Sequence, residues 1–128
     1  KLKHQPKPLL RKNNNEKSVI VWGTGKPLRE FLHATDMADA CVFLMEKYNE
    51  KGFVNIGTGK EISIYELALL IKKITGYEGE IIFDTTKPDG TPRKLMDVSK
   101  LTNLGWKYSI ELEEGIREVY KTKFINEL

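Results

Sequence analysis

Residues that commonly carry metal, redox or nucleophilic chemistry are scarce in this sequence. It has one cysteine, Cys41, and two histidines, His4 and His33, in 128 residues. One cysteine rules out a disulfide within the chain and favours a reducing, cytoplasmic location. The histidines have no cysteine or carboxylate at metal-ligand spacing, and no Ser/Cys–His–acid arrangement is evident, so the sequence indicates no catalytic residue and no metal site. We expect Cys41 in the core and His33 packed or hydrogen-bonded.

Long apolar runs are also absent. No stretch approaches the length of a membrane span, and the N-terminus has no signal-peptide pattern. The length suits one domain with a modest core but is short for a complete enzyme with two substrates. We therefore expect a domain that works as part of something larger.

The net charge of +3 is unevenly distributed. Residues 1–17 hold six basic residues and one acidic residue, a net of +5, whereas the rest of the chain has a net of −2. A basic stripe across a folded face, which nucleic-acid-binding modules usually show, is therefore not indicated. We predict a poorly ordered basic lead-in over 1–17 and a folded domain over 18–128.

Neither glycine-rich segment has the spacing of a phosphate loop. The triplets Gly-Thr-Gly at 23–25 and 57–59 have Leu28 and Ile62 where a dinucleotide fingerprint needs a third glycine. Neither triplet has the spacing of a Walker loop. We expect turns at strand ends, with close approach of a ligand to their backbone as the alternative.

Short β-branched runs alternate with helical patterns, which predicts an α/β or α+β fold with three main helices. A capping box at Ser63–Glu66 predicts a helix start, and Gly76 its end. Thr35 or Asp36 is expected to cap the preceding helix. The expected strands are 18–22, 28–33, 53–56 and 80–83, and the expected helices are 36–48, 63–75, 97–104 and 112–124. The inward faces are expected to carry Met37, Cys41, Leu44, Met45 and Tyr48 in the first helix, and Ile116, Val119, Tyr120 and Phe124 in the last.

Side chains suited to ligands occur on the predicted turns. Trp22 ends a strand before a glycine turn, where an indole can lie against a base or a sugar. Arg29 follows that turn, and its planar guanidinium suits a diphosphate. The proline-stiffened loop 87–94 carries three basic residues around Asp89, which could accept hydrogen bonds from sugar hydroxyls. The alternatives are a core position for Trp22 and an ordinary solvated loop.

Several segments of the sequence resemble the extended short-chain dehydrogenases that act on nucleotide sugars. Within that family, the run Lys-Pro-Asp-Gly-Thr-Pro-Arg-Lys at 87–94 resembles the GDP-L-fucose synthases, which epimerise and reduce GDP-4-keto-6-deoxy-D-mannose with NADPH. The likeness covers roughly residues 18–124 in one register. It rests on Val19–His33, Asn55–Gly59, Ile62–Ala68, Gly76–Gly79 and Lys87–Ser99.

The resemblance implies roles for individual residues. Lys12 corresponds weakly to a further basic substrate contact. At Glu111 the family leads us to expect a serine helix cap. The implied substrate-binding residues are Trp22, Arg29, Asp89, Lys94 and, less closely matched, Arg93.

The resemblance also implies which parts are not in this sequence. The family's glycine-rich cofactor turn, its Tyr-x-x-x-Lys pair and its epimerising Cys and His have no counterpart in these 128 residues. We therefore expect the substrate-binding C-terminal domain, which binds and orients the GDP-sugar but is inactive alone. The intact enzyme would use NADPH and form a homodimer, without nucleic-acid or membrane partners. The alternatives are the substrate domain of another nucleotide-sugar epimerase or dehydratase, a stand-alone nucleotide-binding or nucleic-acid module, and a fragment that binds nothing.

Overall fold

The computed structural model describes residues 16–125, which divide into two compact units. The described part of unit 1 is 16–27 and 63–92, and that of unit 2 is 28–62 and 93–125. Most of the predicted lead-in, Lys12 included, lies outside the described residues. The prediction of a domain over 18–128 therefore stays a prediction, whereas the predicted mixture of helices and short strands is confirmed.

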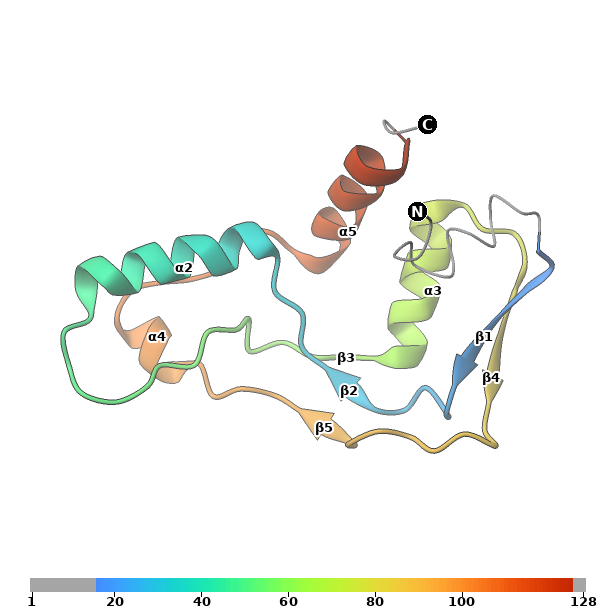
Figure 1. Cartoon of the computed structure of the whole chain (residues 1–128), viewed down its shortest axis with the longest axis horizontal. Coiled ribbons are helices and arrows are strands. Elements are labelled where there is room, and N and C mark those ends of the chain that lie inside the picture. The colour runs from blue at the N-terminus through green and yellow to red at the C-terminus, as the bar shows by residue number, and fades with distance from the viewer. Residues whose placement is uncertain (1–15, 126–128) are drawn as a thin grey trace, which may run out of the picture. The chain divides into compact units, whose positions relative to one another are not determined.

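Unit 1 is built from two parallel strands and one helix. Strand β1 (Ser18–Trp22) pairs with β4 (Glu80–Asp84) in a register that runs from Ser18 opposite Glu80 to Trp22 opposite Asp84. Helix α3 (Ile64–Thr75) lies beside the two strands (Figure 1). An apolar hollow of about 180 Å³ lies between helix and strands, lined among others by Val19, Leu67 and Ile81.

The boundaries of α3 follow from its sequence, as predicted. Ser63 Oγ accepts a hydrogen bond from Glu66 N at 3.1 Å, while Glu66 Oε2 accepts one from Ser63 N at 3.0 Å. This capping box satisfies amide groups that the first turn leaves without partners. The helix ends at Gly76, whose φ of 62° places it in the left-handed region that glycine adopts without strain.

Unit 2 contains the short strands β2 (Leu28–Arg29) and β5 (Arg93–Lys94), which pair in parallel. With β3 (Ile62–Ser63) they form a sheet in the order β3-β2-β5. The strand predicted over 28–33 is therefore only two residues long, because Leu32 turns into the core and Glu30 bonds to neighbouring loops. The strand predicted over 53–56 is absent, because Val54 and Ile56 pack against the core instead of pairing.

The core of unit 2 lies between helices α2 (Ala34–Lys47) and α4 (Ser99–Asn103) and the segment after α4. Four fully or nearly buried side chains form its centre: Ala40, Leu101, Trp106 and Tyr108. Leu32, Phe43, Leu44, Val54 and Ile56 pack around them. The predicted helix 97–104 thus exists but is shorter.

The buried face of α2 differs in part from the predicted one, although Leu44 packs against the core as expected. Met45 is 85% exposed, and Met37 and Cys41 are also exposed, whereas Ala40 and Asp36 are buried. The prediction of Cys41 in the core is therefore wrong. The side of the helix that carries Asp36 is buried because partners distant in sequence satisfy its carboxylate: Asp36 Oδ2 accepts from Ile110 N at 2.9 Å, and Oδ1 accepts from the Ser109 hydroxyl at 2.7 Å.

His33, not Thr35 or Asp36, caps α2. His33 Nδ1 accepts a hydrogen bond from Thr35 N at 3.3 Å. The prediction that His33 is a hydrogen-bonded structural residue is confirmed, and the prediction of the capping residue is wrong. Gly115 of the last helix lies against the His33 ring, since a Cβ there would stand 3.0 Å from Cδ2.

The last helix, α5 (Leu112–Tyr120), continues into one π turn (η1, Lys121–Ile125). Val119 was expected on the inward face but is 43% exposed. Glu111 occupies the cap position without making a side-chain cap, because its carboxylate bonds to Lys60 Nζ at 3.0 Å and to the Tyr108 hydroxyl at 3.1 Å. No helix in the described residues is both long and apolar enough to cross a membrane.

Candidate functional site

The first cluster of predicted ligand residues lies in unit 1, at the turn that follows β1. Trp22 ends the strand and is 70% exposed, so its indole is accessible and the alternative of a core position does not hold. The Lys87 Nζ lies 5.7 Å from the centroid of the Trp22 ring, a cation–π distance. An exposed aromatic surface with a cation beside it suits an anionic ligand that carries a flat group.

Asp89 holds the 87–92 segment against this turn. Its Oδ1 accepts from Thr24 N at 2.7 Å, and its Oδ2 accepts from Thr24 Oγ1 at 2.7 Å. These hydrogen bonds place the pKa of Asp89 below its ordinary value. A Cβ at Gly23 would collide with the Asp89 carboxylate, and the φ of Gly23 is 88°, so the turn requires glycine on both grounds.

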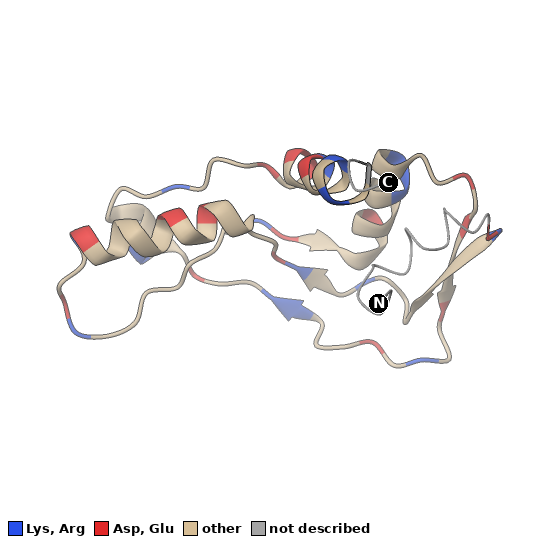
Figure 2. Ribbon diagram, turned by 45° about the horizontal axis from the view of Figure 1, so that its top comes forward, with Lys and Arg blue, Asp and Glu red and all other residues tan. Residues whose placement is uncertain are grey.

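The second cluster lies in unit 2, on the β2–β5 pair. Arg29 stands directly opposite Lys94 in the parallel register, and Figure 2 shows basic residues on both strands. Paired residues of neighbouring strands project their side chains on the same face of a sheet, and the strands lie about 4.8 Å apart. Two basic residues therefore occupy neighbouring positions on one face of the sheet, and the Arg29 guanidinium also donates to the Leu28 carbonyl at 2.6 Å.

Arg93 projects on the other face from Lys94, since successive residues of a strand alternate. Its Nε donates to Glu61 Oε2 at 2.8 Å, and this hydrogen bond raises the pKa of the already basic guanidinium. The ion pair is partly exposed, so it adds little stability. Of the three basic residues here, Arg29 and Lys94 share a face and Arg93 does not.

Glu30 is the residue that the sequence interpretation missed. Its Oε1 accepts from Thr58 N at 2.5 Å and from Gly59 N at 2.7 Å, and its Oε2 accepts from Met96 N at 3.1 Å. The carboxylate thus occupies the second glycine turn, which had been considered for ligand contact. The one available signal was that turn, whose backbone amides favour an anion.

The predicted residues are therefore distributed over the two units. Trp22 and Asp89 meet around the first glycine turn in unit 1, and Arg29, Arg93 and Lys94 lie on the β2–β5 pair in unit 2. Each group contains cationic donors or an aromatic surface of the kind that binds nucleotides. Whether these residues bind substrate stays a prediction.

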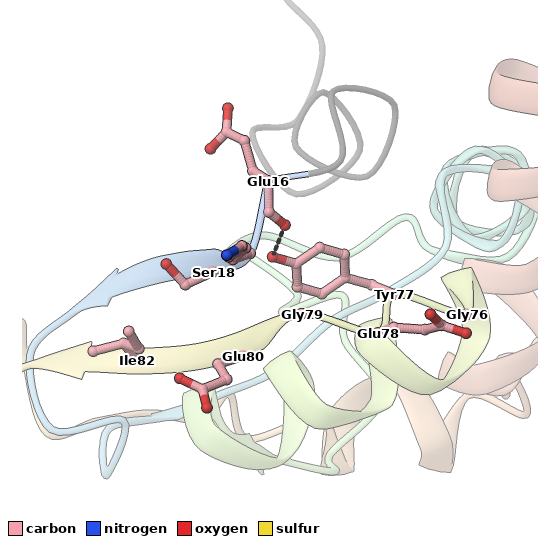
Figure 3. A pocket seen from close by; sticks show the side chains of 9 residues that line it. Glu16, Ser18, Gly76, Tyr77, Glu78, Gly79, Glu80 and Ile82 are labelled. Atoms are coloured by element: carbon pink, nitrogen blue, oxygen red, sulfur yellow. Dashed lines mark hydrogen bonds between the residues drawn. The ribbon is translucent and has the colours of Figure 1, made fainter.

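A large hollow in unit 1 has the wrong charge for a nucleotide. It measures about 800 Å³ and is lined by Glu16, Glu78 and Glu80 with one basic residue, Lys17 (Figure 3). The Tyr77 hydroxyl donates to the Glu16 carbonyl across its edge at 2.9 Å. Three carboxylates repel a diphosphate, so this hollow is not the candidate site. Within residues 16–125 no group of three or more His, Cys, Asp or Glu is placed to hold a metal ion.

Comparison with known proteins identifies the class. The model of the NAD dependent epimerase/dehydratase family matches residues 2–57. A GDP-mannoheptose C4 reductase from Campylobacter jejuni, solved with NADP bound, superposes with a TM-score of 0.76 at 41% identity, covering 89% of this chain and 40% of that one. The chain is similar to nucleotide-sugar epimerases and reductases of this kind.

Within this class the similarity to GDP-L-fucose synthases is confirmed. Putative GDP-L-fucose synthase 2 from Arabidopsis thaliana is 56% identical over 110 residues, which are 86% of this chain and 34% of the relative. A GDP-L-fucose synthetase from Naegleria fowleri superposes with a TM-score of 0.82 at 27% identity, covering 93% of this chain and 38% of that chain. The chain spans about a third of the length of such relatives.

The described glycine turns do not fit the pyrophosphate of a nicotinamide cofactor. The amides of Thr58 and Gly59 already donate to Glu30, and the amide of Thr24 already donates to Asp89. A dinucleotide would have to displace a carboxylate at either turn. Among residues 16–125 we therefore assign no cofactor contact.

Proposed function

We propose that this chain is the substrate-binding part of a GDP-L-fucose synthase. It binds GDP-4-keto-6-deoxy-D-mannose and orients it, while the proton and hydride transfers take place on residues and NADPH that this chain does not supply. The 56% identity to a putative GDP-L-fucose synthase supports the family, and the paired cations Arg29 and Lys94 support binding of a diphosphate. That pairing is the observation that carries the proposal.

The proposed roles follow from the chemistry of each side chain. Arg29 and Lys94 neutralise the diphosphate, and Arg93 contributes to the local positive potential while it stays paired with Glu61. Trp22 lies against the base or the sugar. Asp89 holds the turn beside Trp22 and, through the remaining lone pairs of its oxygens, accepts hydrogen bonds from sugar hydroxyls.

Binding without chemistry has a clear physical role. Holding a substrate in the geometry of reaction converts an encounter into an intramolecular step, which removes much of the entropic barrier. The proposal therefore predicts that the chain alone binds GDP-sugars and turns nothing over. We propose that the intact enzyme, of which this chain would be one part, is a cytoplasmic homodimer.

Isothermal titration calorimetry tests which nucleotide the chain prefers. The chain is titrated with GDP, UDP and dTDP, and NADPH oxidation by the chain is followed by absorbance in the presence of the keto sugar. We expect GDP to bind most tightly and no NADPH oxidation. Preference for UDP or dTDP would assign the chain to another nucleotide-sugar enzyme, and turnover by the chain alone would refute the division of labour.

One alternative within the class has specific support. The GDP-mannoheptose C4 reductase similarity, at 41% identity, favours a GDP-keto-heptose as an alternative substrate of the whole protein. Titration with GDP-mannose and a GDP-heptose distinguishes the two. Tighter binding of the heptose would favour this alternative.

A further inference from the structure

The carboxylate of Glu30 joins three chain segments of unit 2 that are remote in sequence. Glu30 follows directly on β2, and its oxygens accept amide hydrogen bonds from Thr58, Gly59 and Met96 at 2.5, 2.7 and 3.1 Å. Met96 lies two residues beyond Lys94, the last residue of β5. Glu30 therefore connects the end of β2 to the chain that leaves β5 and, through Thr58 and Gly59, to the second glycine turn.

This connection matters because the β2–β5 pair is very short. Each strand has two residues, so the pairing is Leu28 opposite Arg93 and Arg29 opposite Lys94. A two-residue pair has few ladder hydrogen bonds and is not stable by itself. Its last register position brings two basic residues, Arg29 and Lys94, to neighbouring positions. Some other interaction has to keep the strands in register.

The Glu30 carboxylate suits that task in charge and geometry. Hydrogen bonds from backbone amides to a carboxylate are stronger than those between neutral groups. Side chains alternate along an extended segment, so Glu30 projects away from the face that carries Arg29. A Cβ at Gly57 would collide with the carboxylate, which explains glycine at this position.

We propose that Glu30 is a positioning residue that keeps Arg29 and Lys94 side by side for a diphosphate. It does not touch the ligand and acts through the backbone of Gly59 and Met96. The inference rests on the proposed function for the identity of the anion. The hydrogen bonds of the Glu30 carboxylate to Thr58, Gly59 and Met96 are a property of the fold, so their effect on the β2–β5 pair is testable without any nucleotide.

The test compares Glu30→Gln and Glu30→Asp with a matched control, Glu113→Gln. Glu113 is a partly exposed carboxylate of unit 2, paired with Arg117 on α5, so its substitution removes the same charge from a different element. In Glu30→Gln the amide oxygen still accepts from one side, but the amide nitrogen faces a backbone N–H on the other. Glu30→Asp keeps the charge but shortens the reach.

The first readout is nuclear magnetic resonance of the ligand-free chain. We expect the cross-peaks between β2 and β5 to be lost in Glu30→Gln and to be retained in Glu113→Gln, while the resonance of the buried Trp106 indole stays at its wild-type position in both. Persistence of the cross-peaks in Glu30→Gln, with altered shifts only at Thr58, Gly59 and Met96, would overturn the inference.

The second readout is affinity. We expect Glu30→Gln to bind GDP about tenfold more weakly, with guanosine affinity unchanged within about twofold, because only the diphosphate contact is misplaced. Glu30→Asp should retain part of the affinity. If wild-type chain binds no GDP, the proposed function fails, yet the cross-peaks still decide whether Glu30 sets the register. Equal loss of GDP and guanosine affinity would show a general structural role and would overturn the inference.

Discussion

Lys94→Gln should change stability and affinity in opposite directions. Lys94 stands opposite Arg29 on strands about 4.8 Å apart, and the Arg29 guanidinium donates to the Leu28 carbonyl at 2.6 Å, so a Lys94 Nζ turned toward it would lie on the order of 6 Å away. Two like charges at that distance repel by about 0.7 kcal/mol in water, and salt at about 0.1 M reduces this to about 0.4 kcal/mol. Removing the Lys94 charge should therefore raise the melting temperature of the ligand-free chain by about 2 °C.

The same substitution should weaken the binding of GDP. A hydrogen bond to a charged group contributes about 1.5–3 kcal/mol, and the lower end applies at an exposed position such as Lys94. We therefore expect GDP to bind about tenfold more weakly. Opposite signs for stability and affinity are typical of a residue retained for binding and not for folding.

The assay is a thermal melt of wild type and Lys94→Gln at low and moderate salt, with and without GDP. Lys123→Gln is the matched control, because Lys123 lies in the π turn after α5 and away from β5 in sequence. The gain in melting temperature should shrink as salt rises, while the control shows no such gain. A Lys94→Gln variant that melts lower and binds GDP as well as wild type would refute the reasoning.

Three further predictions concern interactions within single units. Asp36→Ala should lower the free energy of unfolding by about 3 kcal/mol in urea titrations followed by fluorescence, because the amides of residues 109 and 110 lose a buried acceptor; Glu46→Gln on the same helix should be neutral. Burial raises the pKa of Asp36, but the hydrogen bonds outweigh it and place the pKa below its ordinary value, so this stabilisation is complete above a pH of about 4 and is lost as the pH falls through the folded-state pKa. Asp89→Asn should place an amide nitrogen opposite a hydrogen-bond donor of Thr24, which releases the 87–92 segment and speeds its cleavage by proteases. An unchanged cleavage rate would contradict the view that Asp89 holds this segment against the turn. Gly57→Ala should displace the Glu30 carboxylate and lower the melting temperature in a thermal melt, and an unchanged melting temperature would contradict the close contact between Gly57 and Glu30.

Local signals in the sequence predicted part of the fold correctly. The capping box at Ser63 and the glycine at 76 fixed both ends of α3, because each acts through backbone groups within one helical turn. The strands predicted over 18–22 and 80–83 are likewise present, as β1 and β4. The ends of α3 are set by neighbours in the chain, whereas β1 and β4 pair with each other although they are far apart in sequence.

Long-range interactions decided the features that the sequence did not predict. The inward face of α2 depends on Asp36, whose partners lie more than seventy positions away, so the apolar pattern of Met37, Cys41 and Met45 pointed to the wrong face. The capture of the second glycine turn by Glu30 depends on a separation of 28 residues. From the sequence alone, Glu30 next to Arg29 is typical of a solvated surface, and only the fold shows that its carboxylate binds backbone amides.

The substrate-binding role of the candidate site stays a prediction. Resemblance placed Trp22, Arg29 and Lys94 among the substrate contacts, and the structure shows Trp22 exposed and the two cations paired. It did not anticipate that Asp89 is already engaged by Thr24 or that Arg93 is paired with Glu61. Such internal partners follow from the fold and not from residue type.

The most direct test is a titration of the isotope-labelled chain with GDP followed by amide resonances. If Arg29 and Lys94 hold the diphosphate, GDP should shift the amide resonances of both residues, and inorganic pyrophosphate should reproduce those shifts. Shifts confined to the acidic hollow around Tyr77, or no shifts at millimolar GDP, would contradict the proposal that this chain holds the GDP-sugar.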